Sequence, residues 1–271
     1  DIERQIVKKI RLERTGYYWF QGLPGTGKTL LLYDMAMKLS VRQQVCLIHC
    51  GEAVEQWKVL HERLRRVKYL ADAQITSDIL SGASAVLVDE AHLLSQEKLE
   101  YLLRYCGNRP VIFSSDYENM LSPEELDRAA VHALEQISGI QSFRLTNRIR
   151  TNAEISSFIQ NMMCLPERKK GRHFPHVTVL YANDDREADV LLSDAQHQGY
   201  QVILNEAEPA ICAGRLAMVL DQRYFYDRQN YLRSDDRSVR RLFHQLNGAK
   251  EELLLVVKQN EPFYAVLLDL L

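Results

Sequence analysis

The chain has 271 residues, of which 46% are hydrophobic and 26% are charged. This composition excludes a disordered or fibrous protein, and the length suits about two domains. The 34 basic and 36 acidic residues give a net charge of −2, so any contact with nucleic acid must be local. No apolar run approaches the roughly 18 residues of a membrane span, and the first residues form no apolar leader. We therefore expect a soluble, cytoplasmic protein with no membrane partner.

Short apolar runs alternate with amphipathic stretches along the whole sequence, a pattern that predicts an α/β fold with mainly parallel sheets. The predicted strands cover 17–21, 45–49, 85–88, 111–115, 177–181, 201–204, 217–220 and 253–257. The predicted helices cover 28–39, 54–67, 96–106, 122–137, 153–163, 187–197 and 262–271, the last of which closes the second domain. We place the domain boundary within 143–152, which gives domains of 1–145 and 146–271. The connection 225–236 is predicted to be irregular and exposed.

Residues 22–29 read Gly-Leu-Pro-Gly-Thr-Gly-Lys-Thr and fill every fixed position of Gly-x-x-x-x-Gly-Lys-Thr, with a predicted strand before them and a helix after. This context predicts a P-loop that binds a nucleoside triphosphate with magnesium. The loop residues Gly22, Pro24, Gly25, Thr26 and Gly27 are expected to surround phosphate oxygens at the start of the helix. Lys28 would reach the β- and γ-phosphates, and the Thr29 hydroxyl would bind Mg²⁺.

Two further strands end in acidic residues. The apolar run 85–88 leads directly into Asp89-Glu90-Ala91-His92, and the run 111–115 leads into Asp116. In open parallel sheets, ligands bind at the carboxyl ends of the strands. We expect Asp89 to hold Mg²⁺, largely through water, and Glu90 to polarise the attacking water. Asp116 is predicted to be a polar sensor that faces the same edge.

Five cysteines, an odd number without a Cys-x-x-Cys pair, argue against a disulfide framework or a zinc ribbon. Cys46, His49 and Cys50 fall in one apolar run. In a strand, Cys46 and Cys50 share one face while His49 points to the other, so we do not expect a metal site there. Trp19 and Trp57 are interpreted as core residues, and His92 as a coupling or packing residue rather than a base.

Taken in order, these motifs resemble those of superfamily 1 helicases of the UvrD/Rep type, and most closely the bacterial Schlafen-like DNA/RNA helicase domain family. The resemblance implies an ATPase with two RecA-like lobes. By the same resemblance, Gln5 would read adenine, residues 115–122 correspond to motif III with Asn119, and residues 145–152 correspond to motif IV with Arg150 as a catalytic arginine. The segment 242–257 is similar to motif VI and the strand that follows it.

The sequence departs from this family at three places. Motif III carries Asn119 where a glutamine is usual. Motif VI reads Leu246-Asn247-Gly248-Ala249-Lys250 in place of Leu-Thr-Arg-Ala-Lys, so the arginine finger is absent, and such an arginine is worth ~10³ to 10⁵ in rate. A motif V is not visible, as though a few residues were missing between Gly214 and Leu216. These departures predict ATP binding with slow hydrolysis.

Two functions stay open on the sequence alone. The first is an ATPase of helicase type that acts on or responds to single-stranded DNA or RNA. The second is a regulatory ATP-binding subunit that switches an effector protein, such as a nuclease in bacterial antiviral defence.

Three segments bear on this choice. The basic run 168–173 is either a solvated loop or a phosphate contact, and the run 63–68 is interpreted as a solvated helix face. The aromatic residues within 224–231 form a docking surface, stack bases or pack on their own domain.

Overall fold

The computed structural model describes residues 2–22, 26–51, 62–116, 121–122, 131–145, 152–168, 173–204, 211–235 and 239–271. The chain divides into two compact units, Asp1–Asn147 and Arg148–Leu271. Each unit has its own sheet.

The first unit is built on a parallel sheet whose described strands follow the order β3-β2-β4-β5-β1-β6. The strands are β1 (Tyr17–Gly22), β2 (Val45–His49), β3 (Val67–Ala71), β4 (Ala85–Asp89), β5 (Val111–Ser115) and β6 (Gln141–Leu145). The near-continuous apolar runs of β2, β4 and β5 are typical of strands that are covered on both faces. These three strands are buried along almost their whole length.

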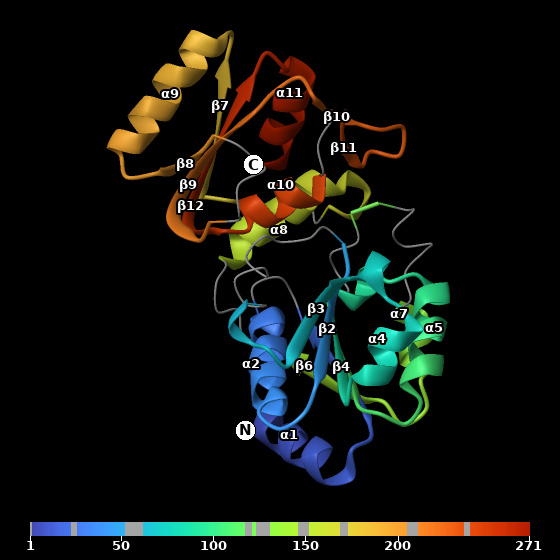
Figure 1. Ribbon diagram of the computed structural model, residues 1–271. Helices are drawn as coiled ribbons and strands as arrows, with labels where there is room; N and C mark the ends of the chain where they lie inside the picture. Colours follow the sequence, from blue (N-terminus) through green and yellow to red (C-terminus); the bar gives the residue numbers. More distant parts are fainter. Residues whose placement is uncertain are drawn as a thin grey trace. The chain divides into compact units, whose positions relative to one another are not determined.

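Helices lie on both faces of this sheet (Figure 1). One face carries α1 (Ile2–Glu13) and α2 (Lys28–Ser40), and the other carries α4 (Ser77–Gly82), α5 (Gln96–Cys106) and α7 (Val131–Glu135). The short 3-10 turns η1 (Asp72–Gln74) and η2 (Ala91–Leu93) join these elements. Side chains alternate between the two layers along each strand. In β2, Val45 and Leu47 face α1 and α2, whereas Cys46 and Ile48 face the other layer.

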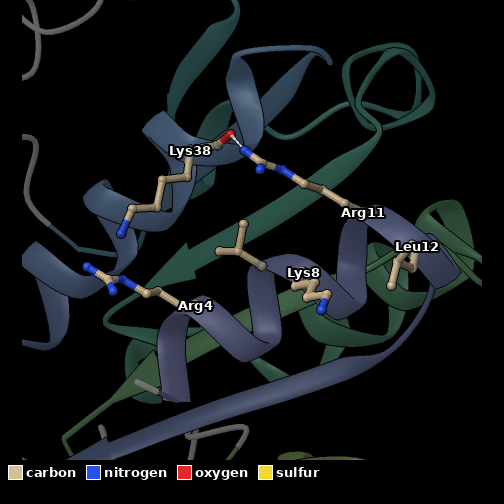
Figure 2. Close-up of a pocket in the computed structure, with 6 residues that line it drawn as sticks. Arg4, Lys8, Arg11, Leu12 and Lys38 are labelled. Carbon is tan, nitrogen blue, oxygen red and sulfur yellow. Dashed lines mark hydrogen bonds between the residues drawn. The ribbon is translucent and has the colours of Figure 1, made fainter.

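Helix α1 packs along the second half of α2, and both helix surfaces are strongly charged there. Lys38 of α2 donates to Glu3 at 2.5 Å and to Asp34 at 2.6 Å. The Arg11 guanidinium donates to the Lys38 carbonyl, one of the last carbonyls of α2, which the helix itself leaves without a partner (Figure 2). A shallow hollow between the helices is lined by Arg4, Val7, Lys8, Arg11, Leu12 and Lys38.

The second unit has a parallel sheet whose described strands follow the order β7-β12-β9-β8. They are β7 (Val177–Ala182), β8 (Gln201–Ile203), β9 (Ala213–Leu220) and β12 (Ala249–Lys258). Helix α9 (Asp185–His197) covers one face. Helices α8 (Ala153–Met163), α10 (Val239–Leu246) and α11 (Glu261–Leu270) lie on the other (Figure 1). The turn η3 (Leu165–Glu167) follows α8.

The predicted fold class, α/β with mainly parallel sheets, is confirmed in both units. The predicted closing helix is present as α11. The helix predicted over 54–67 is wrong at its end, because Val67 begins β3. Lys68 therefore lies on a strand rather than on a helix face. Strand β6 was not predicted. It lies at the edge of the sheet, and its residues alternate between partly buried and exposed, so it forms no continuous apolar run.

The connection 225–236 is not irregular as predicted. An antiparallel hairpin of β10 (Tyr224–Tyr226) and β11 (Leu232–Ser234) occupies it. Asp227 stabilises the turn by accepting the backbone N–H groups of Gln229 and Tyr231 at 2.9 and 3.0 Å. Tyr224 and Leu232 are each 1% exposed, so much of the aromatic segment packs on its own unit.

Gly214, Arg215 and Leu216 are consecutive residues of the single strand β9, and Arg215 pairs in register with Glu252 of β12. The residues 205–210 before this strand lie outside the described part of the chain, and the interruption at motif V stays a prediction from the sequence. In the described part of the chain, no helix combines the length and apolar character needed to cross a membrane.

Candidate nucleotide-binding site

The topology of the first sheet brings three predicted site residues to one edge. Strands β4, β5 and β1 are neighbours and run parallel, so their carboxyl ends lie side by side. Asp89 is the last residue of β4, Asp116 directly follows β5, and Gly22 is the last residue of β1. The order of the strands therefore assembles a site from segments that are up to 94 residues apart, from Gly22 to Asp116.

Strand alternation also places the acidic side chains on the face that carries α2. Leu87 and Ile112 belong to the core shared with α2, and side chains two residues apart on a strand share a face. Asp89 and Ser114 follow these residues by two positions, so they point toward the same layer. Lys28 begins α2 on this face.

Lys28 is buried at the centre of the site, with 6% of its surface exposed. Its Nζ atom donates to the Gly22 carbonyl at 2.7 Å and lies 3.3 Å from Asp116 Oδ2. Asp116 is 1% exposed. A buried ammonium group requires such a partner, because an unpaired charge in this environment is strongly unfavourable.

The start of α2 is shaped for an anion. Gly27, the residue before the helix, has φ 85° and ψ 18°, a left-handed conformation that residues with a Cβ rarely adopt. The first N–H groups of a helix have no partner within the helix, and the helix dipole favours negative charge there. Thr26 is buried beside this turn and Thr29 lies in the first turn of α2. Pro24 and Gly25 lie outside the described residues.

Asp89 is held by hydrogen bonds on both carboxylate oxygens. Oδ1 accepts from the Ser114 hydroxyl at 2.5 Å, and Oδ2 lies 3.3 Å from His49 Nδ1. The side chain is 3% exposed. A fixed carboxylate and the Thr29 hydroxyl are the oxygen ligands that Mg²⁺ prefers, and Mg²⁺ usually keeps several of its waters. Asp89 and Thr29 therefore fit the predicted ion, with Asp89 reaching it through water.

Glu90 has a strained backbone, with φ 54° in the left-handed region, at a cost of about 1–3 kcal/mol for a residue other than glycine. Its Oε2 atom lies 3.3 Å from Nε2 of His92, which is fully buried. His92 Nδ1 accepts the Asp116 backbone N–H at 3.2 Å. We assign the ring proton to Nε2, because Nδ1 acts as an acceptor. His92 thus links the two acidic segments, in agreement with a coupling role.

Three predicted residues are not brought into this site by the described structure. Asn119 and Arg150 lie outside the described residues. Gln5 is exposed on α1, and the charged contacts of α1 with α2 involve Asp34 and Lys38. These residues lie six and ten positions beyond Lys28, about 9 and 15 Å along the helix. The adenine-reading role of Gln5 stays a prediction.

Sequence reasoning missed His49 and Ser114 as partners of Asp89. Both lie opposite it in the sheet: His49 pairs with Asp89 in register, and Ser114 follows Phe113, the partner of Val88. Cys46 and Cys50 are buried on the opposite face from His49. The described residues contain no group of three or more His, Cys, Asp and Glu side chains arranged for a metal ion.

Of the two tryptophans, Trp19 is a core residue, as predicted. It is 1% exposed, and its Nε1 atom donates to the Ser115 hydroxyl at 2.7 Å. Trp57 lies outside the described residues.

In the second unit, the position where superfamily 1 helicases carry an arginine finger is closed to a side chain. A Cβ atom on Gly248 would lie 1.9 Å from the Ile211 carbonyl oxygen. The neighbouring Asn247 points into its own unit, where Oδ1 accepts from the Ser156 hydroxyl at 3.1 Å and Nδ2 donates to the Phe243 carbonyl at 2.8 Å. Lys250 is exposed on β12. The motif VI-like segment therefore serves packing at Asn247 and Gly248.

The first unit has the strand, loop and helix order of a P-loop protein, with two acidic strand ends beside it. No protein-family model and no curated protein matches the chain. Among solved structures, it is similar to the Pif1 helicase from Candida albicans, with 14% identity and a TM-score of 0.39 over 72% of this chain and 54% of that one.

Two further similar structures complete this comparison. A Bacteroides Pif1 helicase in complex with ADP-AlF3 and ssDNA has 15% identity and a TM-score of 0.40, over 73% of this chain and 56% of that one. AMPPCP-bound DnaA from Aquifex aeolicus has 18% identity and a TM-score of 0.37, over 53% and 45%. The chain spans about half the length of these structures.

Proposed function

We propose that this chain binds ATP with magnesium in its first unit and is a superfamily 1 helicase-like ATPase that acts on or responds to single-stranded DNA or RNA. One observation carries the proposal. The buried ammonium of Lys28 lies between the Gly22 carbonyl and the Asp116 carboxylate, at the sheet edge where Asp89 ends β4 and Glu90 follows it. The narrower resemblance to the Schlafen-like family, and the two RecA-like lobes of 1–145 and 146–271, belong to this proposal and rest on the sequence motifs.

Each residue of the site has a defined part in this proposal. Lys28 exchanges the Asp116 carboxylate for the β- and γ-phosphates, while the first N–H groups of α2 bind phosphate oxygens. Asp89 and Thr29 would hold Mg²⁺, which would supply positive charge against the phosphates. Glu90 orients the attacking water and accepts its proton. Asn119 and Arg150 are proposed to act in nucleotide binding and hydrolysis, as the resemblance of their motifs implies.

The second candidate is a regulatory ATP-binding subunit that switches an effector protein. The packing at Gly248 favours it, because an arginine finger has no room at that position. Without this charge on the transferring phosphoryl group, turnover is slow, and ATP binding alone would carry the signal.

ATP hydrolysis with and without single-stranded DNA or RNA tests these two functions. The parent is compared with Lys28→Ala and Glu90→Gln, and with Lys98→Ala and Glu97→Gln as matched controls on α5, where Lys98 pairs with Asp72. Stimulation by nucleic acid that is lost in the first pair and kept in the controls supports the ATPase. Tight ATP binding without turnover in the parent favours the regulatory subunit. Absence of ATP binding contradicts both.

A further inference from the structure

His49 lies beside the carboxylate to which the proposed site assigns magnesium, yet no motif includes it. It ends β2, and Asp89 stands directly opposite it on β4. Its Nδ1 atom lies 3.3 Å from Asp89 Oδ2, and its side chain is 13% exposed. Ser114 on β5 approaches the other oxygen of the same carboxylate at 2.5 Å. The two strands that flank β4 therefore each supply one donor to Asp89.

This arrangement fixes the orientation of the Asp89 side chain. An ionised carboxylate can only accept hydrogen bonds, so the imidazole proton that faces Asp89 is on Nδ1. With a donor on each oxygen, rotation of the carboxylate about its last bond breaks both contacts. Hydrogen-bond partners of this kind orient metal ligands, and their loss typically weakens metal affinity by about 10- to 100-fold.

We propose that His49 is a positioning residue for magnesium: it holds the Asp89 carboxylate, together with Ser114, in the orientation that receives the hydrated ion at the ATP site. This inference rests on the proposed function. It adds a residue from β2 to a site otherwise built from β1, β4 and β5. The competing explanation is that His49 only satisfies a buried carboxylate and so contributes to folding alone.

Substitutions at His49 separate these explanations, because they keep, move or remove the N–H group that faces Asp89. Asparagine carries its N–H on the atom next to Cγ, as Nδ1 does, whereas glutamine places it one bond further out and leucine has none. The measurement is the Mg²⁺ concentration that half-saturates the binding of N-methylanthraniloyl-ATP, a readout independent of turnover. His132→Gln is the control, because His132 also lies near a carboxylate, 3.7 Å from Glu135, but is 79% exposed on α7.

We expect His49→Gln and His49→Leu to raise the half-saturating Mg²⁺ concentration by about tenfold. His49→Asn should stay within about threefold of the parent, and His132→Gln should equal it. A half-saturating concentration within twofold of the parent in a folded His49→Gln or His49→Leu protein would overturn the inference.

Two further outcomes are decisive. If both His49→Gln and His49→Leu fail to fold while His49→Asn folds, the pair serves the fold and the positioning role is wrong. If the parent itself binds no nucleotide, the proposed function fails. Nucleotide binding by the parent with an unshifted magnesium requirement in the variants overturns only the role of His49.

Discussion

Lys28 Nζ lies 3.3 Å from Asp116 Oδ2, and both side chains are more than nine-tenths buried. The Asp116 carboxylate thus pairs with the P-loop lysine at the place where phosphate is proposed to bind. Nucleotide must displace Asp116 from Lys28, and the Asp116 backbone is itself bonded to His92, which faces Glu90. The partner of Lys28 is therefore linked, through Asp116 and His92, to Glu90, the carboxylate that is proposed to activate water.

Replacing Asp116 with asparagine should strengthen ATP binding. The substitution removes the anion that competes with phosphate for Lys28, and we expect an affinity gain of about tenfold, or ~1.4 kcal/mol. The free protein should lose stability, because breaking a buried ion pair typically costs about 3–5 kcal/mol. Titration with a fluorescent ATP analogue and thermal unfolding measure the two effects. Asp72→Asn, at the partly buried pair with Lys98, is the control, and weaker binding by Asp116→Asn would contradict competition.

Replacing His92 with leucine should slow hydrolysis more than it weakens binding. The Asp116 backbone N–H then loses its acceptor in a buried environment, which costs about 1–3 kcal/mol of folding free energy, and Glu90 loses its contact with Nε2. We expect ATP affinity within about threefold of the parent and a much larger fall in turnover. Denaturant unfolding and single-turnover hydrolysis check this prediction. Equal losses in affinity and turnover would show that His92 only packs.

Placing an arginine at position 248, where superfamily 1 helicases carry their arginine finger, should not speed up turnover. A side chain at this position meets the Ile211 carbonyl at 1.9 Å from its first carbon, and overpacking of this kind costs about 1–3 kcal/mol or more. Gly248→Arg should therefore unfold at lower denaturant concentration without a gain in hydrolysis. Lys250→Arg, on an exposed position of β12, should match the parent. A stable Gly248→Arg protein with faster turnover would contradict this account of the segment.

The thiols should react at one position in the native protein. Cys212 is exposed, whereas Cys46, Cys50, Cys106 and Cys164 are buried. Burial raises the pKa of Cys46 to about 12 and that of Cys106 to about 11. These two thiols stay protonated at pH 8, and only the thiolate form of a cysteine reacts. Ellman's reagent at pH 8 should count one thiol per native chain and five after denaturation, and none in native Cys212→Ser. A higher native count would contradict the burial of the core thiols.

The sequence predicted those parts of the site whose signal is local. The motif at Gly22 to Thr29 and the pair Asp89-Glu90 stand at the ends of apolar strands, and the structure brings Lys28 and Asp116 together at that edge. Buried central strands were found because their residues are apolar without interruption. Strand β3, with Lys68 exposed at a sheet edge, lacks this signal.

Cross-strand contacts were beyond the reach of local patterns. His49 and Ser114 reach Asp89 only because β2, β4 and β5 are adjacent and in register, and their distances along the chain say nothing of this. The hairpin over 224–234 was missed for a similar reason. Its strands are short and rich in Tyr and Arg, and the Asp227 turn that joins them becomes evident only with its hydrogen bonds.

In the proposed function, Lys28 anchors a magnesium–ATP complex in the first unit. The decisive experiment is an equilibrium titration of N-methylanthraniloyl-ATP in the presence of Mg²⁺, on the parent and on Lys28→Ala. We expect saturable binding by the parent and binding at least ~30-fold weaker in Lys28→Ala, since loss of a buried charged partner costs about 2 kcal/mol or more. No saturable binding by the parent, or equal binding by both proteins, would contradict it.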